Sequence, residues 1–279
     1  MKKINLLLFT LLFTTIAFAQ KKEKVKGTKI LTVEKHEVAA FTELEVEDNL
    51  EVFLVKGDKN AIEVETDENL HSAINHESHG TSLRLNTNKE ISGFKKLEIR
   101  VTYTDSLKLV SVKHEAKLNA ISGMDLKNIT IKTYDFSKTY LYVNSPNFTI
   151  MANDKSKVEL KLKSEDAFVE MSKNASIKAS ITANKLKFDM YQKSDAIIDG
   201  EVADMKLRLD NNATFEGKKL ASKILNITTE GNTNCSVYNT GSLSITAAGK
   251  SEITIYGEPK IELKKFADDA TLYKKSKQE

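Results

Sequence analysis

The chain has 279 residues, with 42 Lys and Arg side chains against 39 Asp and Glu side chains, and its formal net charge is +3. This near balance excludes the strongly basic surface that a nucleic-acid partner would require. Hydrophobic residues make up 40% of the chain and charged residues 29%, which is typical of a folded protein and excludes bulk disorder.

Residues 1–19 have the pattern of a secretory signal peptide. Lysines at positions 2 and 3 precede an apolar run over residues 6–13, and Ala17-Phe18-Ala19 forms a cleavage site before Gln20. The apolar run is short for a helix that spans a bilayer, so an uncleaved anchor is the less favoured alternative. We therefore expect an exported chain of net charge +1 in the periplasm, on the outer surface or outside the cell.

The only cysteine is Cys235, so no disulfide can form within the chain. No cysteine lies near the expected cleavage site, which argues against attachment to lipid through an N-terminal thiol. No later segment has the roughly 18 apolar residues that a membrane span needs. The exported chain is expected to have no transmembrane segment and to carry no lipid.

The chain repeats itself with a period of about nineteen residues from Phe148 onward. The segments begin at Phe148, Ala167, Leu186, Met205, Leu225, Leu243 and Ile261, after two looser segments that begin near Lys108 and Lys127. The third position is apolar in every segment: Val110, Ile129, Ile150, Val169, Phe188, Leu207, Ile227, Ile245 and Leu263. The eleventh and thirteenth positions are mainly apolar too, and they include Tyr140 and Tyr142.

Apolar and polar residues alternate around these positions, which predicts two short strands per repeat with one buried face each. Corners rich in Asn, Asp and Gly separate the strands, because these residues tolerate the left-handed backbone of a sharp turn. Recurrence of apolar residues at one phase predicts stacked coils: an all-β, right-handed parallel β-helix (solenoid) with nine coils and a length of about 43 Å. A sandwich of repeated antiparallel hairpins is the alternative fold.

The rest of the chain is organised around this repeat region. We expect a lysine-rich, flexible leader over residues 20–37, a non-repeating N-terminal β cap over residues 38–106, solenoid repeats over residues 107–275 and a tail over residues 276–279. Within the cap, residues 68–76 predict one or two helical turns. A cap is expected because the end of a solenoid exposes unpaired backbone and apolar side chains.

The N-terminal third also carries a family resemblance. The stretch Phe41 to Asp58, FTELEVEDNLEVFLVKGD, resembles the opening of the putative auto-transporter adhesin, head GIN domain family of secreted proteins. The match continues through Asp67-Glu68-Asn69-Leu70 and the late Gly257-Glu258-Pro259-Lys260, and covers about residues 38–275. The resemblance implies a right-handed β-helix without an established catalytic set, and a role in adhesion.

Three histidines, His71, His76 and His79, cluster around Glu77. If this segment is helical, His76 and His79 share a face and form a possible metal pair. No well-spaced third ligand accompanies them, so we expect solvated histidines and neither a metal nor another cofactor.

Tyr134 and Phe136 are the candidate ligand contacts. They fall in a segment that is longer than the others, and a longer corner on a rigid rod is a natural binding platform. Exposed aromatic rings can stack on sugar rings, whereas Tyr140 and Tyr142 are expected in the core. The partner would be a glycan or a protein, and packing of the two rings against the cap is the alternative.

No catalytic constellation is evident. Asp195 and Asp199 are expected on different walls of the coil, Asp268 and Asp269 lie in the last coil, and no common hydrolase or nucleotide-binding motif appears. We therefore expect an exported, non-enzymatic β-helix that presents a rigid surface for binding or adhesion at the cell envelope. The alternatives are a polysaccharide lyase or hydrolase of β-helical form, and a structural envelope component that self-associates.

Overall fold

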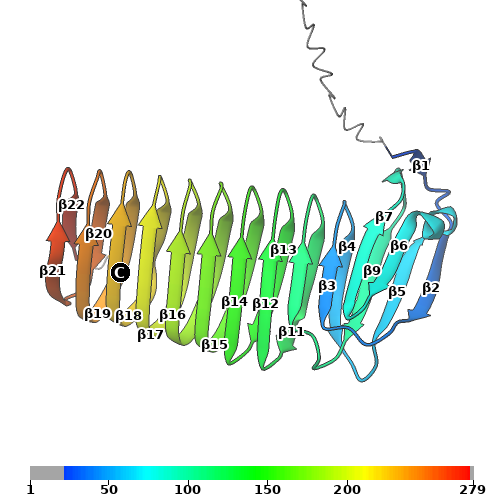
Figure 1. The fold of residues 1–279 in the computed structure, drawn as a ribbon, viewed down its shortest axis with the longest axis horizontal. Helices are drawn as coiled ribbons and strands as arrows, with labels where there is room; N and C mark the ends of the chain where they lie inside the picture. Colours follow the sequence, from blue (N-terminus) through cyan, green and yellow to red (C-terminus); the bar gives the residue numbers. More distant parts are fainter. Residues whose placement is uncertain (1–21, 277–279) are drawn as a thin grey trace, which may run out of the picture.

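The computed structural model describes residues 22–276 and shows a rod of stacked strands with a wider cap at its N-terminal end (Figure 1). The expected signal peptide, residues 1–19, and most of the expected tail lie outside the described residues. The helical element among the described residues is a 3₁₀ turn, η1 (Glu68–Ala73), within the span where helical turns were predicted. No helix within residues 22–276 is long and apolar enough to cross a membrane.

The rod is a parallel β-solenoid of about nine turns with a spacing of about 19 residues, so the predicted fold class is confirmed. Its strands are β10 (Leu109–Val112), β11 (Lys117–Asp125), β12 (Asn128–Thr133), β13 (Lys138–Asn144), β14 (Asn147–Ala152), β15 (Lys157–Met171), β16 (Ser176–Met190), β17 (Asp195–Asp210), β18 (Thr214–Glu230), β19 (Asn234–Ala247), β20 (Glu252–Tyr256), β21 (Lys260–Phe266) and β22 (Thr271–Lys275). These strands pair in parallel throughout. The hairpin sandwich, in which neighbouring strands are antiparallel, is therefore excluded.

Each coil contributes to two walls. The first wall contains β10, β12, β14, the C-terminal halves of β15 to β19, and β21. The second wall contains β11, β13, the N-terminal halves of β15 to β19, β20 and β22. The long strands β15 to β19 thus pass from the second wall to the first.

Inward side chains of the first wall form continuous apolar columns. Ile150 lies beside Val169, and Val169 lies beside Phe188, in register across neighbouring coils. All three side chains are fully buried. Because each coil covers the apolar side chains of the one before, the hydrophobic effect, at about 25 cal/mol per Å² of buried apolar area, acts along the whole rod.

The predicted register is wrong in one early segment of the first wall. Ile129 was predicted to lie beside Val110, but Ile131 lies there. Ile129 belongs to the neighbouring inward column, where it lies beside Phe148. At the other end, Leu263 was predicted to be buried in the column of Val110. It is 52% exposed, because no further coil among residues 22–276 covers it.

The second wall shows the cause of the early register error. Ala120 pairs with Leu141 but Met124 pairs with Val143, so β11 contains a bulge between Ala120 and Met124 that β13 lacks. The extra residues therefore lie before the corner that was predicted to be long. Because successive side chains of a strand point to opposite faces, Tyr140 and Tyr142 face outward, and their predicted place in the core is wrong.

The cap contains antiparallel strands that the repeats lack. Its strands are β1 (Lys24–Lys26), β2 (Leu31–Glu37), β5 (Ala61–Asp67), β6 (Ile74–His79), β7 (Ser82–Thr87), β8 (Glu90–Ser92) and β9 (Leu97–Tyr103). Strand β5 pairs antiparallel with both β2 and β9, β6 pairs antiparallel with β7, and β1 pairs in parallel with β8. The prediction of a flexible leader is wrong for residues 24–26 and 31–37, which pair as β1 and β2.

One further coil lies inside the stretch 38–106. It consists of β3 (Glu43–Val46) and β4 (Glu51–Lys56). Strand β3 pairs in parallel with β7 and β10, and β4 pairs in parallel with β9 and β11. Leu44 and Val52 are fully buried in this coil, so the cap and the repeats share one hydrophobic core.

Candidate ligand-binding surface

Left-handed corners between the first and second walls form a line along the rod. Asp48, His114, Asp135 and Asp154 occupy these corners with φ values of 61°, 57°, 56° and 58°, a region that aspartate tolerates better than most residues. Neighbouring corners are hydrogen-bonded. The Asp48 N–H donates to His114 Nδ1 over 3.4 Å, and the His114 N–H donates to Asp135 Oδ2 over 3.0 Å. A row of polar side chains is thus held in place up to the cap.

A hollow of about 630 Å³ lies where this row meets the cap. The corners supply one side of its lining and β7, β8 and their connection supply the other: Asp48, Asn49, His114, Glu115, Asp135 and Phe136 from the corners, and Thr87, Lys89, Glu90 and Ile91 from the cap, with Lys22 beside them. The volume falls within the range of small-molecule pockets, and the lining combines the apolar side chains of Phe136 and Ile91 with convergent polar groups. We call this space the junction hollow.

Asp48 is the most strongly held polar group of the junction hollow. Its Oδ2 atom accepts hydrogen bonds from the Thr87 N–H at 2.8 Å, the Thr87 hydroxyl at 3.0 Å and the Lys22 ammonium at 2.7 Å. Partial burial alone would raise the pKa of the Asp48 carboxyl, but the bonds from Lys22 and Thr87 outweigh it and lower this pKa. The carboxylate therefore stays ionised, and its hydrogen bonds to Thr87 connect the Asp48 corner to strand β7 of the cap.

The two predicted contact residues differ in their positions. Phe136 lines the junction hollow, its side chain is 56% exposed, and the Lys155 ammonium lies 5.0 Å from its ring centroid. Tyr134 lies at the start of the same corner, is half-buried and does not line the hollow. The structure thus brings Phe136, but not Tyr134, to the junction hollow.

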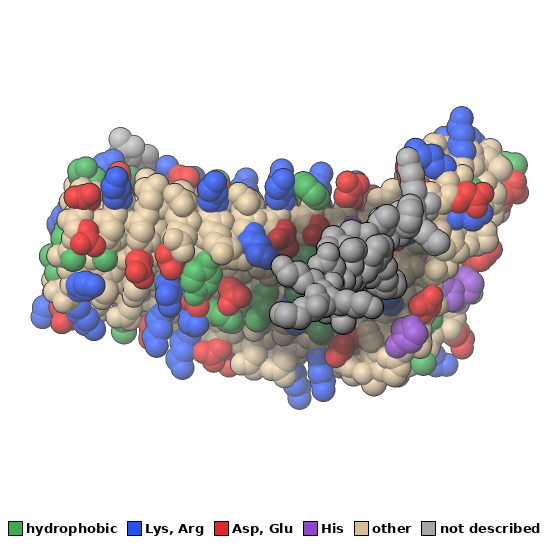
Figure 2. All heavy atoms as spheres, turned by 45° about the horizontal axis from the view of Figure 1, so that its top comes forward, with side chains coloured by type: hydrophobic (Ala, Val, Ile, Leu, Met, Phe, Trp, Pro, Cys, Tyr) green, Lys and Arg blue, Asp and Glu red, His purple; other side chains and the backbone are tan. Residues whose placement is uncertain are grey.

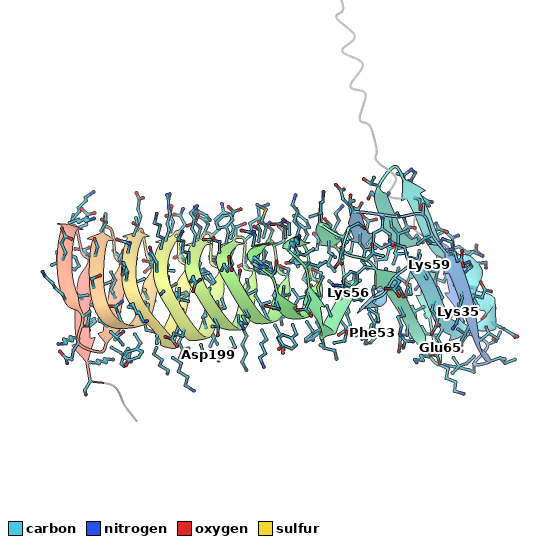
Figure 3. All side chains as sticks on the ribbon, turned by 90° about the horizontal axis from the view of Figure 1, so that it is seen from below. Lys35, Phe53, Lys56, Lys59, Glu65 and Asp199 are labelled. Atoms are coloured by element: carbon cyan, nitrogen blue, oxygen red, sulfur yellow. The ribbon has the colours of Figure 1, made fainter. Side chains whose placement is uncertain are left out.

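A second hollow, of about 330 Å³, lies on the outer side of the second wall. Its lining includes Tyr140, Lys161, Lys178 and Asp199, and Figure 3 shows Asp199 on this outer side. Next to it, Tyr142 is exposed and the Lys161 ammonium lies 5.1 Å from its ring centroid. We call this space the lateral hollow. Sequence reasoning missed it, because Tyr140 and Tyr142 were assigned to the core.

The acidic pair Asp195 and Asp199 lies on one outward face, so the prediction of different walls is wrong. Both side chains are exposed on β17, four residues apart, a span of about 13 Å at the rise of a strand. Burial, and then the charge of Glu216, raise the pKa of the Asp195 carboxyl. Paired glycosidase carboxyls are about 5–9.5 Å apart, which is less than the backbone span between Asp195 and Asp199.

His36, His71, His76 and His79 lie in the cap, and the histidines visible in Figure 2 are at that end of the rod. His76 and His79 belong to strand β6 rather than to a helix, so they point to opposite faces and form no pair. His76 instead contacts His36, with ring centroids 4.5 Å apart, and burial, followed by the charge of His36, lowers its pKa. Across residues 22–276, no group of three or more His, Cys, Asp or Glu side chains is placed to hold a metal ion.

Acidic and basic side chains are mixed along the visible face of the rod, without a zone of one sign (Figure 2). Opposite charges pair between coils, as Lys173 does with Asp154 and Lys185 with Asp166. Such exposed pairs contribute about 0–1 kcal/mol each. They fix the register of neighbouring coils more than they select a charged ligand.

One protein family has a sequence model that matches residues 40–259, and the model is described as putative auto-transporter adhesin, head GIN domain. The chain belongs to this family. The match begins just before β3 and ends just before β21, so it includes the coil of β3 and β4, most of the cap and all but the last coil. No sequence among curated proteins matches the chain.

Solved structures share the fold of this head GIN domain protein. Two described as putative adhesins, from Parabacteroides merdae and Parabacteroides distasonis, have 18% and 20% sequence identity and TM-scores of 0.63 and 0.66. The match covers 90% of this chain in both cases, and 99% and 100% of theirs. A third, described as a putative lipid binding protein from Parabacteroides distasonis, has 14% identity and a TM-score of 0.63, with coverage of 90% and 99%. At these identities the likeness shows the fold alone.

Proposed function

We propose that this protein is an exported, non-enzymatic binding protein that uses the rigid surface of its solenoid for adhesion at the cell envelope. The position of Phe136 carries the proposal. An aromatic ring that is more than half exposed lies in the junction hollow, held on a corner whose neighbours are hydrogen-bonded to one another. A rigid aromatic contact binds a ligand with little loss of side-chain freedom.

The chemistry of the junction hollow favours a glycan as the ligand. The face of the Phe136 ring offers the apolar surface on which the C–H groups of a pyranose ring can stack. Around it, Asn49, Glu90 and Glu115 offer amide and carboxylate groups for hydroxyls. Acidic and basic side chains both line the hollow, which suits a ligand of low net charge better than a polyanion.

Membership in the head GIN domain family supports a binding role over an enzymatic one. The separation of Asp195 and Asp199 supports the same choice, because their backbone span exceeds the carboxyl separation of a glycosidase pair. Export rests on the signal-peptide pattern of residues 1–19.

Binding of the purified chain from Gln20 onward to an array of neutral and acidic glycans tests the proposal. We expect Phe136→Ala to lose most of the signal on the glycans that the parent binds. Tyr142→Ala is the matched control, because Tyr142 is also an exposed ring beside a lysine, but outside the junction hollow. Circular dichroism of each variant shows whether it retains the fold.

A parent protein that binds no glycan on the array contradicts the glycan assignment. If Tyr142→Ala abolishes binding while Phe136→Ala retains it, the contact lies at the lateral hollow and the assignment to Phe136 is wrong. Release of new reducing ends or unsaturated products from the bound glycans would contradict the non-enzymatic role.

A further inference from the structure

The inward-facing side chains of the last strand are polar at the cap end of the rod and apolar at the opposite end. At the cap end, the outermost strand β2 places Glu34 and His36 beside the buried residues of β5, so its inward face is polar. At the opposite end, β21 places Ile261, Leu263 and Phe266 beside the inward residues of β19. Figure 1 shows β21 and β22 at the end of the rod away from the cap. Only this second end continues the apolar columns.

The apolar columns stop abruptly at β21. Leu263 is 52% exposed, whereas Ile245, its neighbour in the preceding coil, is fully buried. All seven residues of β21 are exposed. Within residues 22–276, β21 pairs only with β19 and β22 only with β20, so the outer edge of each strand has free backbone groups. Terminal repeats of solenoids normally have a polar outer face, and this one does not.

We propose that this end of the rod binds the same end of a second copy of the chain, so that two rods form a tail-to-tail dimer. A two-fold axis perpendicular to the rods brings β21 against its own copy in antiparallel orientation. The exposed Ile261, Leu263 and Phe266 then cover the same residues of the second copy. Such an interface is self-complementary, as in most homodimers.

The charges of β21 select one register for this contact. A register centred on Leu263 places Glu262 opposite Lys264 of the second copy, twice by symmetry. Centring on Glu262 or on Lys264 instead places like charges opposite each other, and a one-residue slip sets inward side chains against outward ones. The bulge after Leu263 confines the paired backbone to the residues around Leu263, so apolar packing provides most of the contact.

The same asymmetry explains why the contact forms a dimer and not a fibre. A head-to-tail stack would have to set the apolar columns of β21 against the polar inward face of β2, which carries Glu34 and His36. Burying these polar groups against apolar side chains is unfavourable, even though Glu34 lies near His36 and His71. The two-fold contact uses the apolar end of both copies, and leaves polar cap ends that add no third copy.

Sedimentation velocity and light scattering over a concentration series test the proposal with the chain from Gln20 onward. We expect the parent to approach twice the monomer mass as its concentration rises, and Leu263→Lys to remain a monomer. Ile197→Lys is the matched control, because Ile197 is similarly exposed but lies on the side of the rod. This control should dimerise like the parent, and the thermal midpoint of Leu263→Lys at low concentration should match that of the parent monomer.

A charge exchange tests the register. Glu262→Lys should weaken dimerisation by about tenfold or more, because it sets lysine against lysine at two symmetric places. The double variant Glu262→Lys/Lys264→Glu should recover the affinity of the parent. A parent that stays monomeric at every concentration overturns the proposal. So does a dimer that persists in Leu263→Lys, since its interface must then lie elsewhere.

Discussion

At the scale of single residues, the coil of β3 and β4 contains a buried carboxylate, Glu47, that two cations neutralise. The Arg84 guanidinium lies 2.6 Å from Glu47 Oε2, and the Lys113 ammonium bonds Glu45 and lies 3.4 Å from Glu47 Oε1. Burial alone would raise the pKa of Glu47, but the hydrogen bond and the charges of Arg84 and Lys113 outweigh it and lower this pKa. Glu47 therefore links the cap strand β7 to the first repeat.

We predict a pH-dependent cost for Arg84→Met. The folded-state pKa of Glu47 lies below its ordinary value of 4.5, so its stabilisation is present above that pH and is lost as the pH falls through the folded-state value. Near neutral pH the variant should lose about 1.5–3 kcal/mol of unfolding free energy. In urea unfolding at about pH 3 the difference from the parent should shrink.

Arg100→Met serves as the control for this prediction. Arg100 pairs with Glu63 and Glu98 at the surface, where such pairs contribute about 0–1 kcal/mol. An Arg84→Met cost as small as that of the control, or one that stays constant with pH, would contradict the assigned role of Glu47.

The apolar column makes a sharp prediction at Val169. Val169→Asp places a carboxylate between Ile150 and Phe188 with no partner. It should cost about 3 kcal/mol or more of unfolding free energy. Thr228→Asp, on the outward face of the same wall, should change stability by less than about 0.5 kcal/mol. Thermal melting of both variants checks this, and equal midpoints would show that Val169 does not lie in the core.

At the scale of elements, close stacking of coils leaves no room at some glycines. Gly200 in β17 has a φ of 118°, and a Cβ atom there would overlap the carbonyl oxygen of Ile181 in the preceding coil. Gly80 also has a positive φ, 61°, but a Cβ there meets no atom within 4 Å. The two glycines therefore separate the cost of backbone strain from the cost of steric overlap.

We predict that Gly200→Ala destabilises the protein by about 3 kcal/mol or more, since strain and overlap both apply. Gly80→Ala should cost about 1 kcal/mol, from strain alone. Chemical denaturation of the two variants measures the difference. Equal losses would mean that neighbouring coils can separate locally to admit the methyl group.

The strands that could be predicted from the sequence are the ones whose period is unbroken. From Phe148 onward the alternation of apolar and polar residues places Val169 and Phe188 correctly. The error at Tyr140 and Tyr142 arises because Ile121-Ser122-Gly123 reads as an ordinary strand, while in the structure this stretch holds the two extra residues of a bulge. Spacing alone placed the extra length in the corner at Tyr134 and Phe136, which put Tyr140 instead of Thr139 beside Val158. A repeat with more residues than its neighbours must be irregular. Its length does not show whether the extra residues lie in a strand or in a corner.

At the scale of the whole molecule, long-range pairing limits what the sequence can reveal. Leu44 stacks beside Val110 although β5 to β9 lie between them in the chain, so the period of the repeats is hidden there. For the same reason the exposure of Phe136 could be predicted but the junction hollow could not, because Thr87 and Ile91 of the cap form its other side. The cap also explains the order of the leader, since β5 supplies an open edge for β2.

Distances between spin labels test the stacked coil most directly. Three exposed residues of the second wall lie in register in different coils: Lys138, Thr214 and Glu252. Thr214 lies four coils from Lys138, and Glu252 lies six coils from Lys138. Burial raises the pKa of the Cys235 thiol to about 12, so Cys235 should stay unlabelled while cysteines introduced at exposed positions react. An excess of unlabelled chain removes distances between copies.

The pulsed electron resonance distance should be about 19 Å for Lys138→Cys/Thr214→Cys and about 29 Å for Lys138→Cys/Glu252→Cys, which is about 4.8 Å per coil. Distances that fail to grow with the number of intervening coils would contradict the continuous parallel stack on which the binding surface and the dimer contact both depend.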